Sequence, residues 1–167
     1  MIIGIVCVDN NWGIGKKNDL LFHLKKDMQF FKNTTADSIV FCGYNTLLSF
    51  PGSKPLKGRS TIVLSPKEAE RDDCFCIHDF DAAVKLVKEI AKTKNVYVIG
   101  GGMLYNSMLP YYDEVLVTKV DADGEAEVFF PNLDETADFE GKPIGRPVQD
   151  GDYTIQFWTY KRKTLED

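Results

Sequence analysis

Residues 95–108 read NVYVIGGGMLYNSM, and this stretch decides the fold class. The apolar, β-branched run Asn95–Ile99 predicts a buried strand. Three glycines at 100–102 follow it, and the residues after them predict a helix through Met108. Because a strand that passes directly into a helix is the repeating unit of α/β proteins, we expect a mostly parallel sheet.

The glycine run also suggests a binding role. Glycine lets a ligand approach the main chain closely. A helix beginning at Gly102–Met103 would direct free N–H groups and its positive dipole end at an anion such as a pyrophosphate. The G-x-G-x-x-G fingerprint of ordinary dinucleotide-binding folds is absent from this stretch. A tight strand-to-helix turn without a ligand is the alternative explanation.

The rest of the chain alternates in the same way. Predicted strands cover Ile2–Val8, Ser38–Cys42, Ser60–Leu64, Phe75–Ile77, Glu114–Val120 and Tyr153–Lys161. Predicted helices cover Leu24–Lys32, Tyr44–Phe50 and Asp79–Lys92, the last with Asp79 as its N-cap, and Asp9–Leu21 is predicted as a loop. The last strands follow one another without a good helix between them. The predicted class is therefore α/β, with a mostly parallel central sheet and an antiparallel C-terminal edge.

Length and composition narrow the class of protein. The chain has 167 residues, which predicts one domain over residues 1–167, and 44% of them are hydrophobic. A net charge of -5 argues against a nucleic-acid partner. No apolar stretch approaches the roughly 20 residues of a membrane helix, and the apolar start Met1–Val8 lacks the features of a signal peptide. We therefore expect no membrane partner and a cytoplasmic location.

A metal site is not expected. The four cysteines form no C-x-x-C pair, and Cys74 and Cys76 would share one face of a strand as reduced, buried thiols. The acidic stretch Asp121–Glu127 has its glycine too early for a calcium-binding helix–loop–helix and is better explained as a solvated turn.

Asp27 is the most informative single residue. On a helix over Leu24–Lys32, one apolar stripe contains Leu24, Met28 and Phe31, and Asp27 falls inside it. A carboxylate in that position costs several kcal/mol of desolvation unless it gains a partner. Three explanations remain open: it caps or pairs with a nearby arginine or backbone group, it lies at the exposed edge of the stripe, or it binds a ligand that carries paired N–H donors.

Five segments resemble the dihydrofolate reductase family, in the family's order and over nearly the whole chain. They read VCVDNNWGIGKKNDLLFHLKKDMQFFK (6–32), IVFCGYNTLLSF (39–50), LKGRSTIVLS (56–65), VYVIGGGMLY (96–105) and VLVTKVDADGEAEVFFP (115–131). The resemblance implies a three-layer α/β fold. It also implies reduction of 7,8-dihydrofolate to 5,6,7,8-tetrahydrofolate with NADPH, in support of one-carbon and thymidylate metabolism. A monomer that binds antifolate inhibitors is expected.

The resemblance assigns a substrate site. Asp27 matches the acid that holds the pterin's amino-amidine edge by two parallel hydrogen bonds, and Thr118 matches the threonine that supports it. Asp27 would orient the pterin and favour its protonated form, while water delivers the proton. Arg59 matches the arginine that clamps the α-carboxylate of the glutamate tail. The expected pocket walls, each equally credible as plain core or turn, are Ile5, Cys7, Met28, Phe31, Phe50, Leu56 and Ile99.

The resemblance also assigns a cofactor site. Thr46, Gly101 and Gly102 would hold the pyrophosphate, Cys7 and Ile14 would meet the carboxamide through their backbones, and Tyr105 would lie beside the nicotinamide. Asp9–Leu21 would be a mobile lid. The remaining expected cofactor contacts are Gly15, Asn18, Gly43, Leu64, Ile99, Met103 and Leu104.

Two positions depart from the family pattern. Many relatives have Pro-Trp at Leu21-Phe22, and Phe22 has no indole N–H to hold the water of the proton route. Tyr44 replaces a basic residue that binds the extra phosphate of NADPH, a role that Ser65, Lys67 and His78 could take. The alternatives are a riboflavin-pathway pyrimidine reductase, which would need neither Asp27 nor Arg59, and a non-catalytic nucleotide-binding or structural protein of the same fold.

Overall fold

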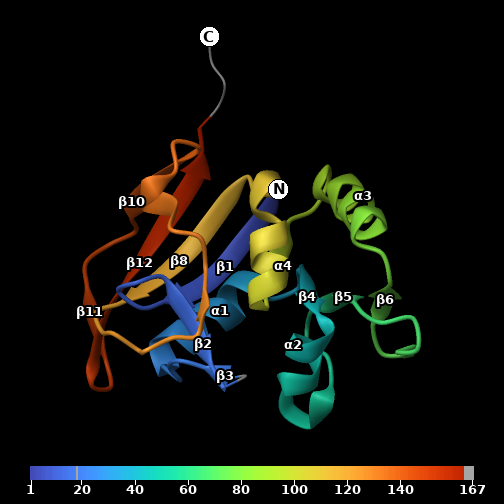
Figure 1. Ribbon diagram of the computed structural model, residues 1–167, viewed down its shortest axis with the longest axis horizontal. Helices are drawn as coiled ribbons and strands as arrows, with labels where there is room; N and C mark the ends of the chain where they lie inside the picture. The colour runs from blue at the N-terminus through green and yellow to red at the C-terminus, as the bar shows by residue number, and fades with distance from the viewer. Residues whose placement is uncertain (18, 164–167) are drawn as a thin grey trace.

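The computed structural model describes residues 1–17 and 19–163. Nine of the described strands form one sheet, in the order β10-β12-β8-β1-β7-β4-β5-β6, and β11 pairs with β12 at the edge (Figure 1). The strands are β1 (Ile2–Val8), β4 (Ile39–Gly43), β5 (Ser60–Leu64), β6 (Phe75–Ile77), β7 (Val96–Val98), β8 (Glu114–Val120), β10 (Phe139–Pro143), β11 (Val148–Asp150) and β12 (Tyr153–Arg162). All pairs from β8 to β6 are parallel, and β12 is antiparallel to β8. The predicted class is confirmed.

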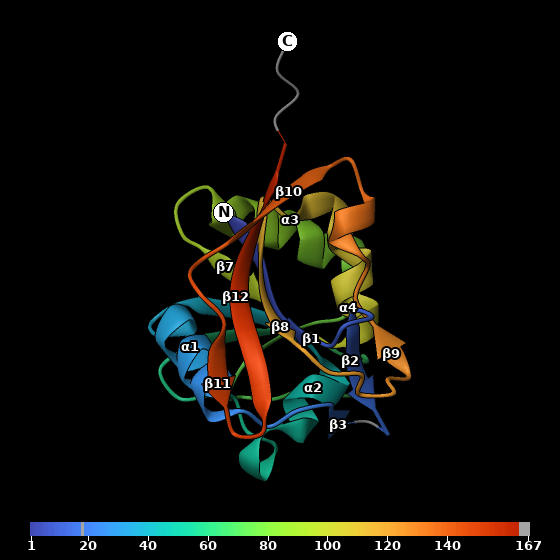
Figure 2. The same ribbon diagram turned by 90° about the vertical axis from the view of Figure 1, so that its left-hand side faces the viewer.

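Helices cover both faces of this sheet. They are α1 (Lys25–Thr35), α2 (Tyr44–Ser49), α3 (Phe80–Ala91) and α4 (Gly102–Ser107), with short 3₁₀ turns at Pro51–Ser53, Leu109–Tyr111 and Leu133–Glu135. Alternate residues of β1 serve the two layers: Val6 packs with α3 and α4, whereas Ile3 and Ile5 pack with α1 and α2. Figure 2 shows α1 and α4 on opposite sides of the sheet. None of the helices in the described ranges is long and apolar enough to cross a membrane.

Local sequence chemistry explains where α3 begins. Asp79 caps α3 as predicted, because its carboxylate accepts a hydrogen bond from the Ala82 N–H at 2.9 Å. The strands over Ile2–Val8, Ser60–Leu64, Phe75–Ile77 and Glu114–Val120 have the predicted bounds. The other predicted elements differ by a few residues at their ends; α1 for example runs on to Thr35.

Three predictions need correction. Asp9–Leu21 is not only a loop: it contains β2 (Gly13–Lys16) and β3 (Asp19–Leu20), which form a second small sheet with β9 (Val128–Phe129). Strands this short are stable only when they pair with other parts of the chain. The stripe of α1 is wrong at Met28, whose side chain is 59% exposed, because the buried face passes through Phe31 and Thr35 instead.

The third correction concerns the cysteines. Only Cys42 is buried, whereas Cys74 and Cys76 are half-buried, because Cys76 lies in the edge strand β6 and Cys74 comes just before it. Their sulfurs are 4.0 Å apart, which confirms that they share a face, and the described residues contain no disulfide. No cluster of metal-binding side chains is found in the described part of the chain.

Candidate functional site

The Asp27 carboxyl lies where α1 crosses the carboxyl ends of two parallel strands. Cys7 of β1 and Thr118 of β8 are direct neighbours in register, and both side chains lie close enough to Asp27 for hydrogen bonding to lower the pKa of its carboxyl. Burial raises the pKa of Asp27 above its ordinary value, the hydrogen bonds from Thr118 and Cys7 partly oppose the rise, and the negative charge of Asp150 adds to it. Burial and then the neighbouring Asp27 raise the pKa of the Cys7 thiol, so the carboxyl faces a neutral thiol.

Asp27 has no charged partner of opposite sign. Within residues 1–17 and 19–163, none of the ion pairs involves it, and no backbone N–H donates to its carboxyl. Since Asp27 is half-buried rather than exposed, neither an internal ion pair nor the exposed edge explains it. An acid held in this way can bind a ligand with two N–H donors.

An apolar cluster, here called the apolar floor, contains most of the residues expected to wall the pocket. Five of the expected pocket walls come from five different elements or loops and meet in one cluster on the α1 and α2 face: Ile5, Phe31, Phe50, Leu56 and Ile99. Ile5 and Ile99 are buried, whereas the other three are half-buried and retain an accessible surface. Met28 is mostly exposed, and its contact with substrate stays a prediction.

Arg59 stands at the far end of α1 from Asp27. Its Nε donates to the Thr35 Oγ1 at 3.1 Å, one terminal nitrogen donates to the Lys57 carbonyl at 2.8 Å, and the guanidinium lies 5.8 Å from the centre of the Phe31 ring. Within the described ranges no carboxylate pairs with Arg59. The neutral contacts fix its position and leave its charge for an anion.

Two helix beginnings meet at the glycine run. The Gly43 N–H before α2 donates to the Gly100 carbonyl at 2.8 Å, so the starts of α2 and α4 are adjacent. Neither helix has a side-chain N-cap, and a Cβ placed on Gly101 would lie 3.3 Å from the Thr46 Oγ1. Bare N–H groups beside a hydroxyl are a suitable cradle for a pyrophosphate.

A polar cluster lies beyond the ends of β5 and β6. The His78 Nδ1 is 3.0 Å from the Ser65 carbonyl oxygen, and its Nε2 is 2.8 Å from a Glu70 carboxylate oxygen. The bond to the Ser65 carbonyl and then that to Glu70 raise the pKa of His78. Lys67 is exposed, whereas Tyr44 is half-buried against the apolar floor. Ser65 and His78 are thus in contact, and Lys67 lies close enough for its charge to lower the pKa of His78.

The other predicted site residues are distributed as follows. The Tyr105 hydroxyl donates to the Ile5 carbonyl at 2.7 Å, and Tyr105 and Leu104 are buried. Ile14 is buried near Gly102, whereas Met103 is 88% exposed. Phe22 packs edge-on against Tyr153, with ring centres 5.0 Å apart. Gly15 and Leu64 lie in β2 and β5, and Asn18 is outside the described residues.

Two residues near the site escaped sequence reasoning, Asp150 and Glu70. The pair Asp150-Gly151 is a hairpin signal that could have predicted β11. No local pattern shows that the Asp150 carboxylate reaches the start of α1, or that Glu70 reaches His78 across a loop. Both contacts are products of tertiary packing.

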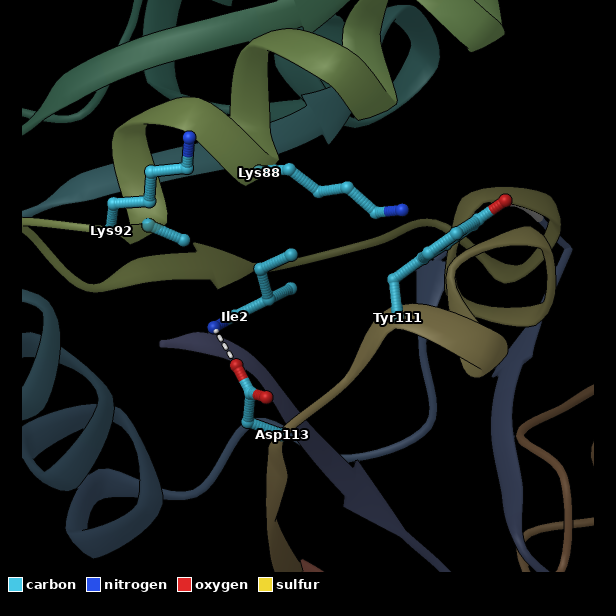
Figure 3. A pocket seen from close by; sticks show the side chains of 6 residues that line it. Ile2, Lys88, Lys92, Tyr111 and Asp113 are labelled. Atoms are coloured by element: carbon cyan, nitrogen blue, oxygen red, sulfur yellow. Dashed lines mark hydrogen bonds between the residues drawn. The ribbon is translucent and has the colours of Figure 1, made fainter.

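A separate hollow lies near the N-terminal end of β1, far along the strand from Cys7, and is shown in Figure 3. Its acid, Asp113, already accepts a hydrogen bond from the Ile2 N–H at 2.7 Å, and the Lys88 ammonium lies 4.8 Å from the centre of the Tyr111 ring. Because these polar groups have partners and no predicted site residue lines it, we place the functional site at the opposite end of the sheet.

Comparisons with known proteins point to one family. A family model described as dihydrofolate reductase matches residues 1–162. The chain is 31% identical over 166 residues to the dihydrofolate reductase of Bacillus subtilis strain 168, covering 98% of this chain and 95% of that relative. It is 30% identical over 162 residues to that of Staphylococcus haemolyticus, covering 95% and 93%. A solved dihydrofolate reductase from Enterococcus faecalis, complexed with NADP(H) and RAB-propyl, superimposes with a TM-score of 0.82 and 25% identity over 98% of this chain and 97% of that one.

Proposed function

The chain belongs to the dihydrofolate reductase family, and from that premise we infer that it reduces 7,8-dihydrofolate to 5,6,7,8-tetrahydrofolate by hydride transfer from NADPH. The observation that carries this function is the Asp27 carboxyl, which lies between Cys7 and Thr118 without a basic partner in the described residues. No observation favours a riboflavin-pathway reductase or a non-catalytic protein. The protein is an NADPH-dependent oxidoreductase.

We propose that Asp27 orients the pterin. A carboxylate and an amino-amidine edge form two parallel hydrogen bonds, in the geometry of a carboxylate–guanidinium pair. The Thr118 hydroxyl would donate a hydrogen bond to a carboxylate oxygen of Asp27 and would also contact the pterin amino group. Because burial raises the pKa of Asp27, the pair of acid and pterin retains a proton more readily than it would in water. That supports the protonated pterin, whose imine carbon accepts hydride more easily.

The residues around the glycine run suit NADPH. NADPH supplies the hydride when it is bound, and we propose that the uncapped N–H groups at the starts of α2 and α4, with Thr46, hold its pyrophosphate. A Cβ on Gly102 would lie only 2.4 Å from Val128 Cγ1, so the backbone there has to stay bare. Ser65, Lys67 and His78 would meet the additional phosphate, in place of the basic residue that Tyr44 replaces.

Two further roles complete the proposal. Arg59 would bind the α-carboxylate of the glutamate tail, since its neutral contacts hold the guanidinium without neutralising it. Phe22 cannot hold a water by an indole N–H, so the proton would come from solvent that reaches the ring past the lid formed by residues 9–21.

The coarser properties follow from the family. The protein binds a small-molecule substrate and inhibitors, and we propose that antifolates are among those inhibitors. We further propose that residues 1–167 form one domain, that the protein is a monomer and that it is cytoplasmic. The nine-stranded sheet supports the first of these, because it joins strands from Ile2 to Arg162.

The direct test is oxidation of NADPH in the presence of dihydrofolate, with and without a diaminopyrimidine antifolate. We expect turnover that the inhibitor abolishes. Turnover only with the pyrimidine substrate of riboflavin synthesis would favour the alternative reductase, and binding of NADPH without any turnover would favour a non-catalytic protein.

A further inference from the structure

Asp150 caps a helix to which it does not belong. The N-cap position of α1 is Leu24, which has no side chain able to accept a hydrogen bond. One oxygen of the Asp150 carboxylate instead accepts from the Lys26 N–H at 2.8 Å and from the Asp27 N–H at 3.3 Å. Asp150 is 5% exposed, and a buried carboxylate at a helix N-terminus is favoured by the helix dipole. The helix that carries the site acid is therefore held by a residue of β11.

The hairpin of β11 and β12 makes further contacts with the same turn of the helix. The Lys26 ammonium donates to the Gln149 carbonyl at 2.7 Å. Leu24 packs in one apolar cluster with Ile155 of β12 and Val148 of β11. Figure 2 shows β11 beside the beginning of α1. Three kinds of contact thus fix the first turn of α1 to the hairpin.

The charge of Asp150 is directed at the site. Titratable groups that interact with Asp27 are Cys7 of β1, Tyr105 of α4 and Asp150 of β11. Burial raises the pKa of both the Cys7 thiol and the Tyr105 hydroxyl, so both are neutral at pH 7. Asp150 is the one of these three that brings a negative charge, and it raises the pKa of Asp27.

We propose that Asp150 is a positioning residue for dihydrofolate reduction: its carboxylate holds the first turn of α1 so that Asp27 faces Thr118 and Cys7, and it places a second negative charge behind that acid. This inference rests on the proposed function. Asp150 touches neither reacting group and acts through Asp27. Its two contributions, hydrogen bonding and charge, are separable by substitution.

The test uses two variants of the full chain. Asp150→Asn retains an oxygen that can accept from the two N–H groups but removes the charge, whereas Asp150→Ala removes both. Asp152→Asn, an exposed acid of the same hairpin, is the matched control. The first readout is the titration of the Asp27 carboxyl carbon by NMR in the ligand-free protein, which requires no turnover. The second is the pH profile of kcat/KM for dihydrofolate.

We expect Asp150→Asn to lower the titration midpoint of Asp27 by about half a pH unit or more, because a like charge close to a partly buried acid has been removed. Asp150→Ala should also reduce kcat/KM by about tenfold through misplacement of the acid, with KM for NADPH within about twofold of wild type. Asp152→Asn should change neither.

Two results would overturn the inference. One is an unchanged Asp27 midpoint in Asp150→Asn; the other is an unchanged kcat/KM in a folded Asp150→Ala. If Asp150→Ala does not fold, Asp150→Asn alone decides the charge effect. A wild-type protein that does not reduce dihydrofolate would reject the proposed function instead, while the NMR titration would still decide whether Asp150 acts on Asp27.

Discussion

Asp9 and Asp27 are acids at the same end of the molecule, yet they are held in opposite ways. Asp9, directly after β1, is 3% exposed, and its carboxylate accepts from three backbone N–H groups, those of Asn11 at 2.9 Å, Gly13 at 2.7 Å and Gly124 at 2.9 Å. Within the described residues no backbone N–H donates to the Asp27 carboxylate, and only the side chains of Thr118 and Cys7 lie close enough to lower its pKa by hydrogen bonding. Both are removed from bulk water, but only Asp9 has the number of donors that a buried carboxylate needs.

The difference separates a structural acid from the acid that we propose binds the pterin. The Asp9 carboxylate links the turn over Asn11–Gly13 to the loop that contains Gly124. Its hydrogen-bonding capacity is therefore satisfied by groups within the protein. A Cβ on Gly13 would lie 2.3 Å from the Cβ of Ala126, so the two segments are in close contact. Asp27 keeps unused hydrogen-bonding capacity next to an apolar floor, and the missing donors are those that a pterin would supply.

The largest effect should follow from Asp27→Asn. We expect kcat/KM for dihydrofolate to fall by about 100-fold or more, since the amide cannot accept both pterin N–H groups or carry charge. Asp37→Asn, an exposed acid replaced in the same way, is the control. Near-wild-type turnover of Asp27→Asn across the pH range would remove the functional half of the comparison.

The same variant makes an opposite prediction for stability. The pKa of Asp27 is raised above the value of 3.8 expected when unfolded, so the unfolded chain loses this proton first. Ionised Asp27 therefore lowers the free energy of unfolding once the pH exceeds the pKa of Asp27 in both the unfolded and the folded protein. Asp27→Asn should be at least as stable as wild type at pH 7, and this advantage should vanish in acid. Thermal melts over the pH range measure it, and destabilisation at pH 7 would contradict it.

Asp9→Ala should do the reverse. Three N–H groups would lose their acceptor, so we expect a loss of about 2–3 kcal/mol in the free energy of unfolding. Turnover measured well below the melting temperature should fall much less than in Asp27→Asn. Urea unfolding and kcat/KM together test this, with the exposed Asp123→Asn as the control. A stable Asp9→Ala variant without turnover would show that Asp9 belongs to the chemistry.

Sequence reasoning reached these two acids unequally. Asp27 was predictable because a helix has a fixed period, so one acid among apolar positions is conspicuous even though the stripe was wrong at Met28. Asp9 was placed only at the start of a loop. Its partner Gly124 is 115 residues away, and no local pattern encodes such a contact.

The same division holds for the whole fold. The core strands and α3 were predictable from apolar runs and the Asp79 cap, because the pattern of consecutive residues indicates which of them are buried. β2, β3, β9, β10 and β11 were not predicted, because they are short, exposed or dependent on a distant partner strand. The capping of α1 by Asp150 was not predicted for the same reason, because it depends on a distant segment.

Arg59 extends the comparison to a cation. Its hydrogen bonds to Thr35 and Lys57 are to neutral groups. These bonds fix its position, as hydrogen bonds fix that of Asp9, but its charge has no partner of opposite sign in the described residues, as with Asp27. Arg59→Lys should raise KM for dihydrofolate by about tenfold, because an ammonium cannot form the bidentate pair with a carboxylate. KM for a pterin without the glutamate tail should hardly change. Arg71→Lys, whose guanidinium pairs with Asp73, is the control, and equal effects on both substrates would refute the clamp.

In the His78 ring, one nitrogen is bonded to an internal group, as in Asp9, and the other can be reached by a ligand, as in Asp27. Changes at this residue should have the smallest effect on activity. One nitrogen is tied to the Ser65 carbonyl, whereas the other meets Glu70, an exposed acid that a phosphate could displace. The bonds to Ser65 and Glu70 raise the pKa of His78, so its positive charge is lost only as the pH rises through that raised value. The preference for NADPH over NADH, measured as the ratio of kcat/KM values, should decline over the same interval.

Glu70→Gln tests which half of the ring matters. Without the carboxylate, the pKa of His78 should fall, so the decline in preference should begin at a lower pH. At a pH below the His78 pKa of both wild type and variant, the preference for NADPH should rise by about two- to threefold, because the phosphate no longer competes with an acid. Glu68→Gln, an exposed acid two residues earlier, should leave the profile unchanged. If Glu70→Gln behaves like Glu68→Gln, then His78 is a structural residue like Asp9, and Ser65 and Lys67 alone remain for the phosphate.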